Sequence, residues 1–275
     1  MAIITISRGS LSGGQQLAER AASQLGYRCI SREVLLEAAA RYGVPEMKLS
    51  ELFEKKPSFW EWLTRSRERY LVFIQAAMCE AAQSGDLVYH GQAGQELLAG
   101  ISHVLKVRLI APLERRALTA MEQRGLDHEA ATRHIQRIDD ERYRRMRDLF
   151  NVDWRDPALY DVVLNLQRMS INTAVEMVVG LAKQAEFQPT PESTRAMENL
   201  TVAARVKATL LANPTTNDIP LDVQADGGIV RISGVITAID DGQIEDRLRE
   251  LAMSTQGVKS VVLDVQFRPV LAQPG

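Results

Sequence analysis

At 275 residues the chain is long enough for one large domain or two ordinary ones, and its 45% apolar and 25% charged residues are typical of a globular protein. A net charge of −2 gives no overall electrostatic case for nucleic acid or an anionic membrane, and two cysteines, Cys29 and Cys79, are too few for a disulfide framework. The apolar start is too short for a secretory signal, and no stretch approaches the roughly 20 apolar residues of a membrane helix. We therefore expect a cytoplasmic protein with no transmembrane segment.

The first feature along the chain is an apolar run at residues 2–7 followed by a glycine-rich turn, GSLSGG, at residues 9–14. The run predicts a strand buried on both faces of a parallel sheet, and the turn has the glycine spacing of a phosphate-binding loop. Apolar residues then recur at helical spacing over 15–25, and Gly26 ends that helix. Backbone N–H groups in such a strand–turn–helix unit hold phosphate oxygens.

The two positions after the turn depart from the standard loop. A lysine that reaches the β- and γ-phosphates and a hydroxyl that binds magnesium are expected there, but the chain has Gln15 and Gln16. Each glutamine keeps hydrogen-bonding reach and lacks a charge or a hydroxyl. The sequence therefore predicts a nucleotide-binding fold whose activity is open.

Strand-like and helical patterns alternate through the next part of the chain. Strand-like runs lie at 27–30, 87–90, 104–111 and 160–166, and helical patterns lie at 34–42, within 46–84, at 114–149 and at 171–184. This alternation predicts an α/β domain, with a mostly parallel, doubly wound sheet, that ends near residue 186.

The C-terminal part has a different pattern. Residues 187–197 carry two prolines without periodicity and are expected to be a linker. Residues 198–268 then read as helix, strand, strand, helix and strand, with Asp226-Gly227-Gly228 as the hairpin turn. A second, small α+β domain is therefore expected at 198–268.

Three segments resemble the cytidylate kinase-like family of P-loop nucleoside monophosphate kinases. They are the N-terminal ITISRGSLSGGQQ stretch, residues 87–125 with Ala-Pro-Leu-Glu, and residues 138–178 with Asp-Trp, Asp-Pro, Tyr-Asp and Asn. The resemblance covers about residues 1–182. It implies a P-loop kinase-like parallel sheet with flanking helices and, with ATP and Mg²⁺, phosphoryl transfer to a pyrimidine nucleoside monophosphate such as CMP.

The same resemblance implies a set of site residues. For the nucleotide cofactor these are Arg8, Gly9, Ser12, Gly13, Gly14, Gln15 and Gln16. For the acceptor they are Ser31, Gly91 and Gln92, and the lid arginines Arg142 and Arg145 are the catalytic candidates. No cluster of metal ligands is found in the sequence.

Several of these positions lack the charge that the family carries. Gln15 stands for a basic residue, Gln92 for the arginine of a Gly-Arg motif, and Ser31 for an acidic residue. Because phosphoryl transfer depends on positioning and on cancelling charge, an active kinase and a catalytically weak pseudokinase that senses nucleotide both stay open. A pure interaction protein is a third possibility. The basic segment 133–147 is either a lid over ATP phosphates or a solvated helix face.

The segment 198–268 resembles the BON domain, through the DGG turn, the run VRISGV and Gly257-Val258. That resemblance implies a module that binds a ligand or a protein partner and carries no catalytic residues.

Overall fold

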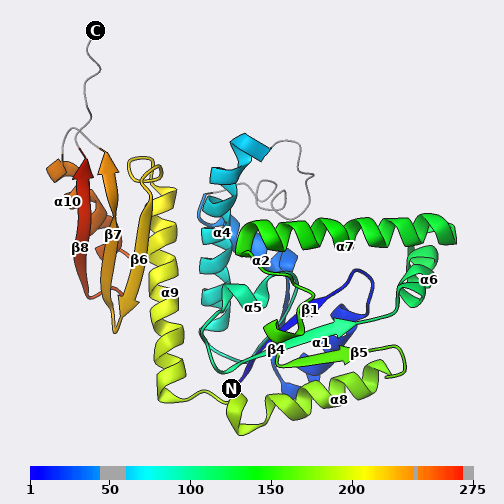
Figure 1. The fold of residues 1–275 in the computed structure, drawn as a ribbon. Coiled ribbons are helices and arrows are strands. Elements are labelled where there is room, and N and C mark those ends of the chain that lie inside the picture. The colour runs from blue at the N-terminus through cyan, green and yellow to red at the C-terminus, as the bar shows by residue number, and fades with distance from the viewer. Residues whose placement is uncertain (44–59, 238–240, 269–275) are drawn as a thin grey trace.

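The computed structural model describes the backbone of residues 1–43, 60–237 and 241–268 (Figure 1). Within these ranges, the strands form two sheets. The larger has five strands in the order β2-β3-β1-β4-β5, and the smaller has three in the order β6-β7-β8. The first part of the helical pattern expected at 46–84 lies outside the described residues.

All neighbours in the larger sheet are parallel. Its strands are β1 (Ile3–Arg8), β2 (Arg28–Ser31), β3 (Leu87–His90), β4 (Val104–Ile110) and β5 (Val162–Asn165). They agree with the expected runs to within two residues at each end. The α/β class with a parallel sheet and flanking helices is confirmed.

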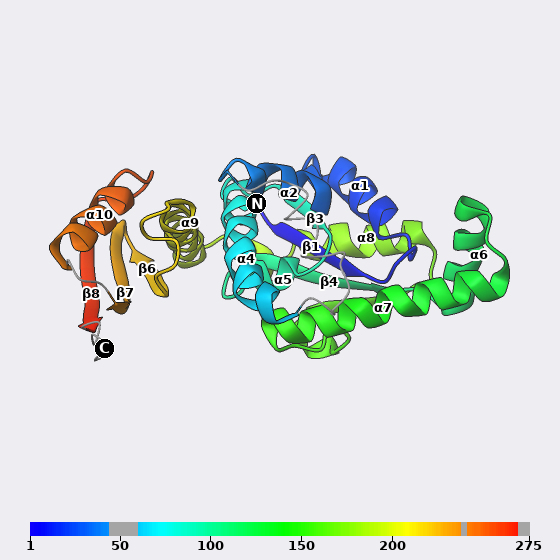
Figure 2. The ribbon, with the colours of Figure 1, turned by 90° about the horizontal axis from the view of Figure 1, so that it is seen from above.

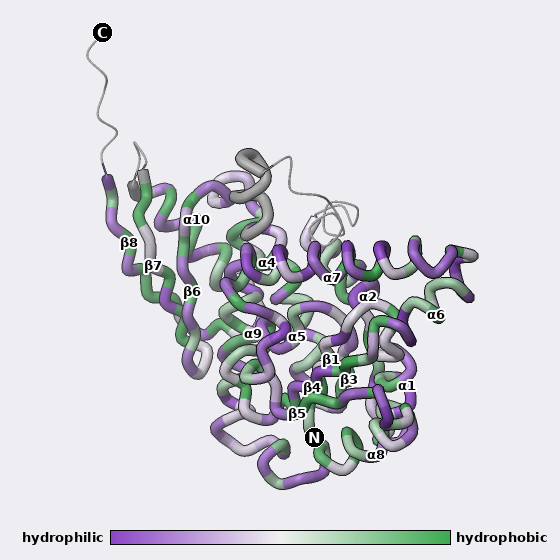
Figure 3. Tube along the Cα trace, turned by 45° about the vertical axis from the view of Figure 1, so that its right-hand side comes forward, coloured by the Kyte–Doolittle hydropathy of each residue, from purple (hydrophilic) through white to green (hydrophobic). Residues whose placement is uncertain are grey.

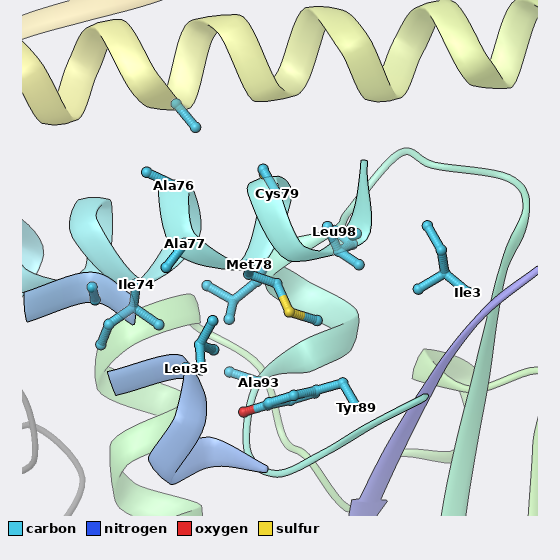
Figure 4. Close-up of a cluster of buried hydrophobic side chains, with 14 of the residues drawn as sticks. Ile3, Leu35, Ile74, Ala76, Ala77, Met78, Cys79, Tyr89, Ala93 and Leu98 are labelled. Carbon is cyan, nitrogen blue, oxygen red and sulfur yellow. The ribbon is translucent and has the colours of Figure 1, made fainter. Parts of the chain in front are cut away.

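Alternate residues of the central strands enter two different cores. Ile3 and Tyr89 pack with α2 (Arg32–Ala40), α4 (Trp60–Ala82) and α5 (Gly94–Leu97). Figure 4 shows this first core, with Tyr89 beside Leu35 and Met78. Ile4 and Ile6 instead face α1 (Gly14–Leu25) and α8 (Ile171–Ala182). Both faces of the sheet are covered, and the central strand β1 is buried from Ile3 to Ser7.

Two charged helices run along the loop end of the sheet. They are α6 (Leu113–Arg124) and the long α7 (His128–Phe150), which Figure 2 shows crossing beside the sheet. Most of α7 is hydrophilic (Figure 3), because it buries one narrow stripe that includes Ile135 and Met146. Short 3₁₀ helices lie at Pro157–Leu159 and Ala185–Phe187.

The expected linker at 187–197 is helical over most of its length, which corrects the prediction. Helix α9 (Pro191–Ala212) begins at a proline in its first turn, and Thr190 and Ser193 form a reciprocal capping box. Proline is a helix breaker in an interior but suits a first turn, so the composition of this segment misled the sequence prediction.

Helix α9 contributes to two hydrophobic cores. Its Ala204 and Ala208 belong to the first core, which they join beside α4, whereas Val206 and Leu210 belong to a third core in the C-terminal part. In Figure 4, Ala76 and Cys79 point from α4 toward α9. The C-terminal part is thus joined to the larger sheet by packing as well as by the chain.

The C-terminal part consists of α9, β6 (Leu221–Asp226), β7 (Ile229–Thr237), α10 (Asp241–Met253) and β8 (Ser260–Arg268). Strands β6 and β7 are antiparallel, and β7 and β8 are parallel. The hairpin turn is held against α9, because Asn199 Oδ1 accepts from Gly227 N–H at 2.9 Å. This is the expected order of elements, and its assignment to the BON domain stays a prediction.

None of the helices in the described ranges combines the length and apolar character that a membrane-crossing span requires.

Candidate functional site

The glycine-rich turn joins β1 to α1 as the sequence predicted. Gly13 has φ of 83°, a left-handed conformation that favours glycine, and it precedes α1 without a side-chain cap. Ser12 is buried, and its hydroxyl donates to Gly9 O at 2.9 Å, which fixes the loop from inside. The N–H groups of the first helical turn are therefore available to an anion, as they are in phosphate-binding loops that join a strand to a helix.

Arg8 lies across the start of α1. A Cβ atom on Gly14 would come within 1.9 Å of Arg8 Cδ, so glycine is needed for this close approach. Burial lowers the pKa of Arg8, with a further lowering by Arg32 and an opposing effect of Glu33. The guanidinium is thus held at the loop, at a cost in desolvation that an anion would offset.

Arg116, which sequence reasoning missed, holds the other side of the loop. Its Nε donates to Ser10 O at 2.6 Å, and its Nη1 lies 2.7 Å from Asp139 Oδ2 of α7. A Cβ on Gly9 would be 3.0 Å from its Cζ. Arg116 lies two residues after the Ala-Pro-Leu-Glu run that carried the family resemblance, so its position in that segment was the available signal.

The two lid candidates are both buried. Arg142 donates to Arg8 O from α7, and its guanidinium lies 5.1 Å from the ring centre of Trp154. Burial lowers the pKa of Arg142 to about 9, opposed by Asp139 and reinforced by the positive charges of Arg8, Arg145 and Arg116. Arg145 is buried on the same side of α7, with 7% of its surface exposed.

The remaining arginines of the basic segment behave differently. Arg133 pairs with Glu129 and Arg137 with Glu141, and both arginines are exposed, as are Arg144 and Arg147. One face of α7 is thus solvated, as one interpretation of residues 133–147 expected, and the other face brings Arg142 to the loop. A lid over ATP phosphates stays a prediction.

Side chains from β4 and from the segment after α7 support Arg142. Arg108 of β4 donates to Trp154 O, and its guanidinium lies 4.4 Å from the centre of the Trp154 ring. Tyr160 Oη donates to Trp154 O at 2.7 Å and contacts Ser7 Oγ at 3.1 Å. The indole is thus contacted by both Arg108 and Arg142, and Arg108 also lies 5.6 Å from the ring centre of Tyr160, so the Asp-Trp and Tyr-Asp motifs orient cationic groups.

The cluster formed by Arg8, Arg116 and Arg142 brings three positive charges together near the carboxylates of Asp139 and Glu33. Three of its N–H groups, Arg8 Nε, Arg116 Nη2 and Arg142 Nε, have no hydrogen-bond partner among the described residues. Buried charges and donors are costly unless paired, and a polyphosphate supplies both the charge and the acceptors. The residues present therefore fit nucleotide phosphates.

A pocket of about 600 Å³ adjoins the loop. Its walls include Gln15 and Gln16 of α1, Arg115 and Thr119 of α6, and Ile171 of α8. Gln15 Nε2 donates to Glu19 Oε1 at 2.8 Å, so this side chain is tied to its own helix. Another pocket, of about 650 Å³, lies between α4 and the α9–β6 region, away from the motif residues.

The fit of the site to Mg²⁺ differs from its fit to phosphates. No group of three or more His, Cys, Asp or Glu side chains in the described ranges could hold a metal ion. Mg²⁺ commonly binds through substrate phosphates with one or two protein groups. The ion would therefore be held mainly by the nucleotide.

The three acceptor candidates meet at the ends of β2 and β3. Ser31 caps α2 and is paired in register with His90, which precedes Gly91. Gly91 N–H donates to Ile6 O at 3.3 Å, and Tyr89 Oη donates to Gln92 O at 3.0 Å. The edge is thus next to the phosphate loop, and the contact found for Gln92 is through its backbone.

Sequence reasoning also missed two charges at this edge, Arg32 and Glu33 in the first turn of α2. Their side chains are 3.0 Å apart, and both influence the pKa of Arg8. His90 is buried, and burial and the charge of Arg8 lower its pKa. The signal for Arg32 was its position directly after the strand that ends at Ser31.

The family model described as "Cytidylate kinase-like family" matches residues 3–168, which is more than half of the chain. The chain belongs to the cytidylate kinase-like family. All four loop features described above, the glycine turn, Arg8, Arg116 and Arg142, lie inside the matched range.

Two named relatives agree with this membership, and a solved structure shares the fold. A cytidylate kinase of Methanopyrus kandleri is 31% identical over 177 residues, covering 61% of this chain and 86% of the relative. One of Ignicoccus hospitalis is 28% identical over 179 residues, covering 65% of this chain and 97% of the relative. The crystal structure of an uncharacterised protein from Eubacterium ventriosum superposes with a TM-score of 0.53 at 19% identity, covering 66% and 97% of the two chains. That likeness shows the fold.

Proposed function

We propose that this member of the cytidylate kinase-like family is a nucleoside monophosphate kinase that transfers a phosphoryl group from ATP to a pyrimidine nucleoside monophosphate such as CMP. The observation that carries the proposal is the convergence of Arg8, Arg116 and Arg142 on an uncapped phosphate loop. Relatives named cytidylate kinase support the choice of acceptor.

In this proposal the loop amides and Arg8 hold the donor phosphates beside the pocket of about 600 Å³. Arg142, with Arg145 beside it, offsets charge that develops on the transferred group, which is the main catalytic task in phosphoryl transfer. The edge at Ser31, Gly91 and Gln92 holds the acceptor. Mg²⁺, bound to the ATP phosphates, supplies further charge neutralisation when present.

The test is a coupled assay of ADP formation with ATP, Mg²⁺ and either CMP or dCMP. Acceptor-dependent turnover supports the proposal. A folded protein that shows no turnover above background contradicts the enzyme.

A pseudokinase is the second candidate, and the specific observation in its favour is the loss of charge at both Gln15 and Gln92. Calorimetry with ATP and CMP distinguishes the two. Micromolar nucleotide binding without turnover would establish a nucleotide-sensing module, and its output would pass to the C-terminal part. Absence of binding would leave an interaction protein.

Restoring the two charges tests whether their loss limits turnover. The double variant Gln15→Lys and Gln92→Arg should raise kcat/KM about tenfold or more, because a charge-assisted contact to phosphate is roughly twice as strong as a neutral one. Gln24→Lys, which adds a charge at the far, exposed end of α1, is the matched control and should leave kcat/KM unchanged. Equal rates for all three proteins would show that charge is not what limits turnover.

For the C-terminal part we propose a BON-type module that binds a ligand or protein partner. Its support is the α-β-β-α-β order and the glycines of its turns. Gly257, with φ of 95°, lies so close to α9 that a Cβ would be 2.7 Å from Val202 Cγ2.

A further inference from the structure

Glu80, on α4, is contacted by side chains from two other helical regions. Its Oε1 accepts from Arg205 Nε of α9 at 3.1 Å and from Tyr42 Oη, beyond the end of α2, at 3.1 Å. Its Oε2 lies 3.6 Å from Arg41 Nη2. Arg205 Nη2 also donates to Gln83 Oε1 at 3.1 Å, so the guanidinium spans one turn of α4.

The contact between Glu80 and Arg205 is the better shielded of the two ion pairs. The side chain of Arg205 is 15% exposed and that of Glu80 is 27% exposed, whereas Arg41 is 70% exposed. Exposed pairs contribute little, while a shielded pair with several hydrogen bonds holds its geometry. Burial and the carboxylate of Glu80 raise the pKa of Tyr42, which keeps its hydroxyl protonated as a donor.

Helix α2 links this contact to the acceptor edge. It is nine residues long, so its ends are about 13 Å apart. One end is at Ser31 and Arg32, beside His90, and the other leads directly to Arg41 and Tyr42, whose ring stacks on Phe73 at 5.7 Å between centroids. A short helix moves as a unit, so its far end affects the position of its first turn.

Helix α9 links the same contact to the C-terminal part. Arg205 lies between Ala204 of the first core and Val206 of the third core. A rotation or shift of α9 that repacks the third core therefore also moves Arg205. Figure 1 shows α9 lying between α4 and the small sheet.

We propose that Arg205 and Glu80 are positioning residues through which the C-terminal part sets the placement of α2, and with it the acceptor edge. The proposal rests on the proposed function for the identity of the acceptor, CMP. Neither residue touches a nucleotide; each acts through α2.

The experiment compares the full chain with Arg205→Ala, Arg205→Lys and the control Arg195→Ala. Arg195 is on the same helix, and among the described residues its ion pair is with Asp226 of the C-terminal part. Two readouts are taken from each protein: hydrogen exchange of the amides at 35–42 without ligand, and calorimetric affinities for CMP and ATP.

Arg205→Ala should increase exchange over 35–42 and weaken CMP binding roughly three- to tenfold, with ATP affinity changed less than about twofold. Arg205→Lys should restore part of both effects, because it keeps the charge and loses one of the two contacts. Arg195→Ala should match the wild type in both.

The outcomes separate this inference from the proposed function. Unchanged exchange at 35–42 in Arg205→Ala overturns the coupling whatever the protein binds. Increased exchange with unchanged CMP affinity overturns the role at the acceptor edge. A wild type that binds no CMP contradicts the proposed function and this acceptor role together, and increased exchange in that case still establishes the hold on α2.

Discussion

The proposed donor loop and the proposed acceptor edge lie side by side, and each lacks a cation that its motif would carry. At the donor loop, where Gln15 replaces a basic residue, guanidinium groups from β1, α6 and α7 converge on the turn. At the acceptor edge, where Gln92 replaces an arginine, Arg32 in the first turn of α2 is paired with Glu33 at 3.0 Å. His90 adds no charge at neutral pH, because burial lowers its pKa.

The difference shows that charge can be supplied by tertiary structure when it is absent from a motif. Long helix α7 delivers Arg142 to the loop from more than a hundred residues along the chain. Among the described residues, the contact found at Gln92 comes from the neutral Tyr89 hydroxyl and not from a guanidinium group. We therefore expect the chain to bind ATP more tightly than CMP. The variants below test this asymmetry by changing residues at the donor loop and at the acceptor edge.

Loss of Arg142 should have the largest effect. Arg142→Ala removes a buried cation at the loop and leaves Arg8 O without its donor. ATP-dependent turnover should fall on the order of 10²- to 10³-fold, by analogy with the loss of other transition-state cations. Steady-state kinetics at saturating CMP measure it.

Arg144→Ala is the control for that variant, since Arg144 is exposed on the opposite face of α7. It should keep wild-type rates. A comparable loss in both variants would mean that α7 as a whole is damaged, and would contradict a specific role for Arg142.

Regular structure was predictable because its signals are local. The apolar run before Gly9 and the spacing of Leu17 and Ala21 are set by strand and helix periods, and both elements form where expected. The helix over 191–197 was not predictable in this way, because proline and threonine are common both in linkers and in first helical turns. Only the capping box at Thr190 distinguishes a helix start from a linker here.

The site was predictable in part. Glycines of the loop and Arg142 followed from the motif, but Arg116 and Asp139 did not. These two residues are 23 positions apart, on different helices, and they meet only because α6 and α7 pack together. Pairing between helices depends on tertiary packing, which a single sequence does not reveal.

Gly91→Ala should disturb the acceptor edge more than the donor loop. A Cβ at Gly91 would lie 2.2 Å from Tyr89 Oη, so the phenol would have to move and lose its contact with Gln92 O. Overpacking of this kind costs about 1–3 kcal/mol. Urea unfolding should show that loss, and calorimetry should show weaker CMP binding with ATP affinity preserved.

Gly180→Ala provides the comparison. Nothing lies within 4 Å of a Cβ at Gly180 of α8, and alanine favours a helix, so this variant should be as stable as the wild type or more so. If Gly91→Ala is as stable as Gly180→Ala and binds CMP normally, the edge is not sterically fixed by Tyr89.

The smallest effect should come from His90 and should appear only as a pH dependence of stability. Burial, with the charge of Arg8, lowers the folded-state pKa of His90, so the unfolded chain takes up the proton first as pH falls. The stability that neutral His90 provides is therefore present above about pH 6.5 and is lost as the pH falls through the lowered folded-state pKa. One proton limits the slope to about 1.4 kcal/mol per pH unit.

In urea unfolding at pH 8, 6 and 5, His90→Gln should lose less stability than the wild type on acidification, with His103 and His134 contributing equally to both proteins. If the two proteins lose stability equally on acidification, His90 takes up its proton equally in the folded and the unfolded chain. That result would contradict the statement that His90 adds no positive charge to the acceptor edge.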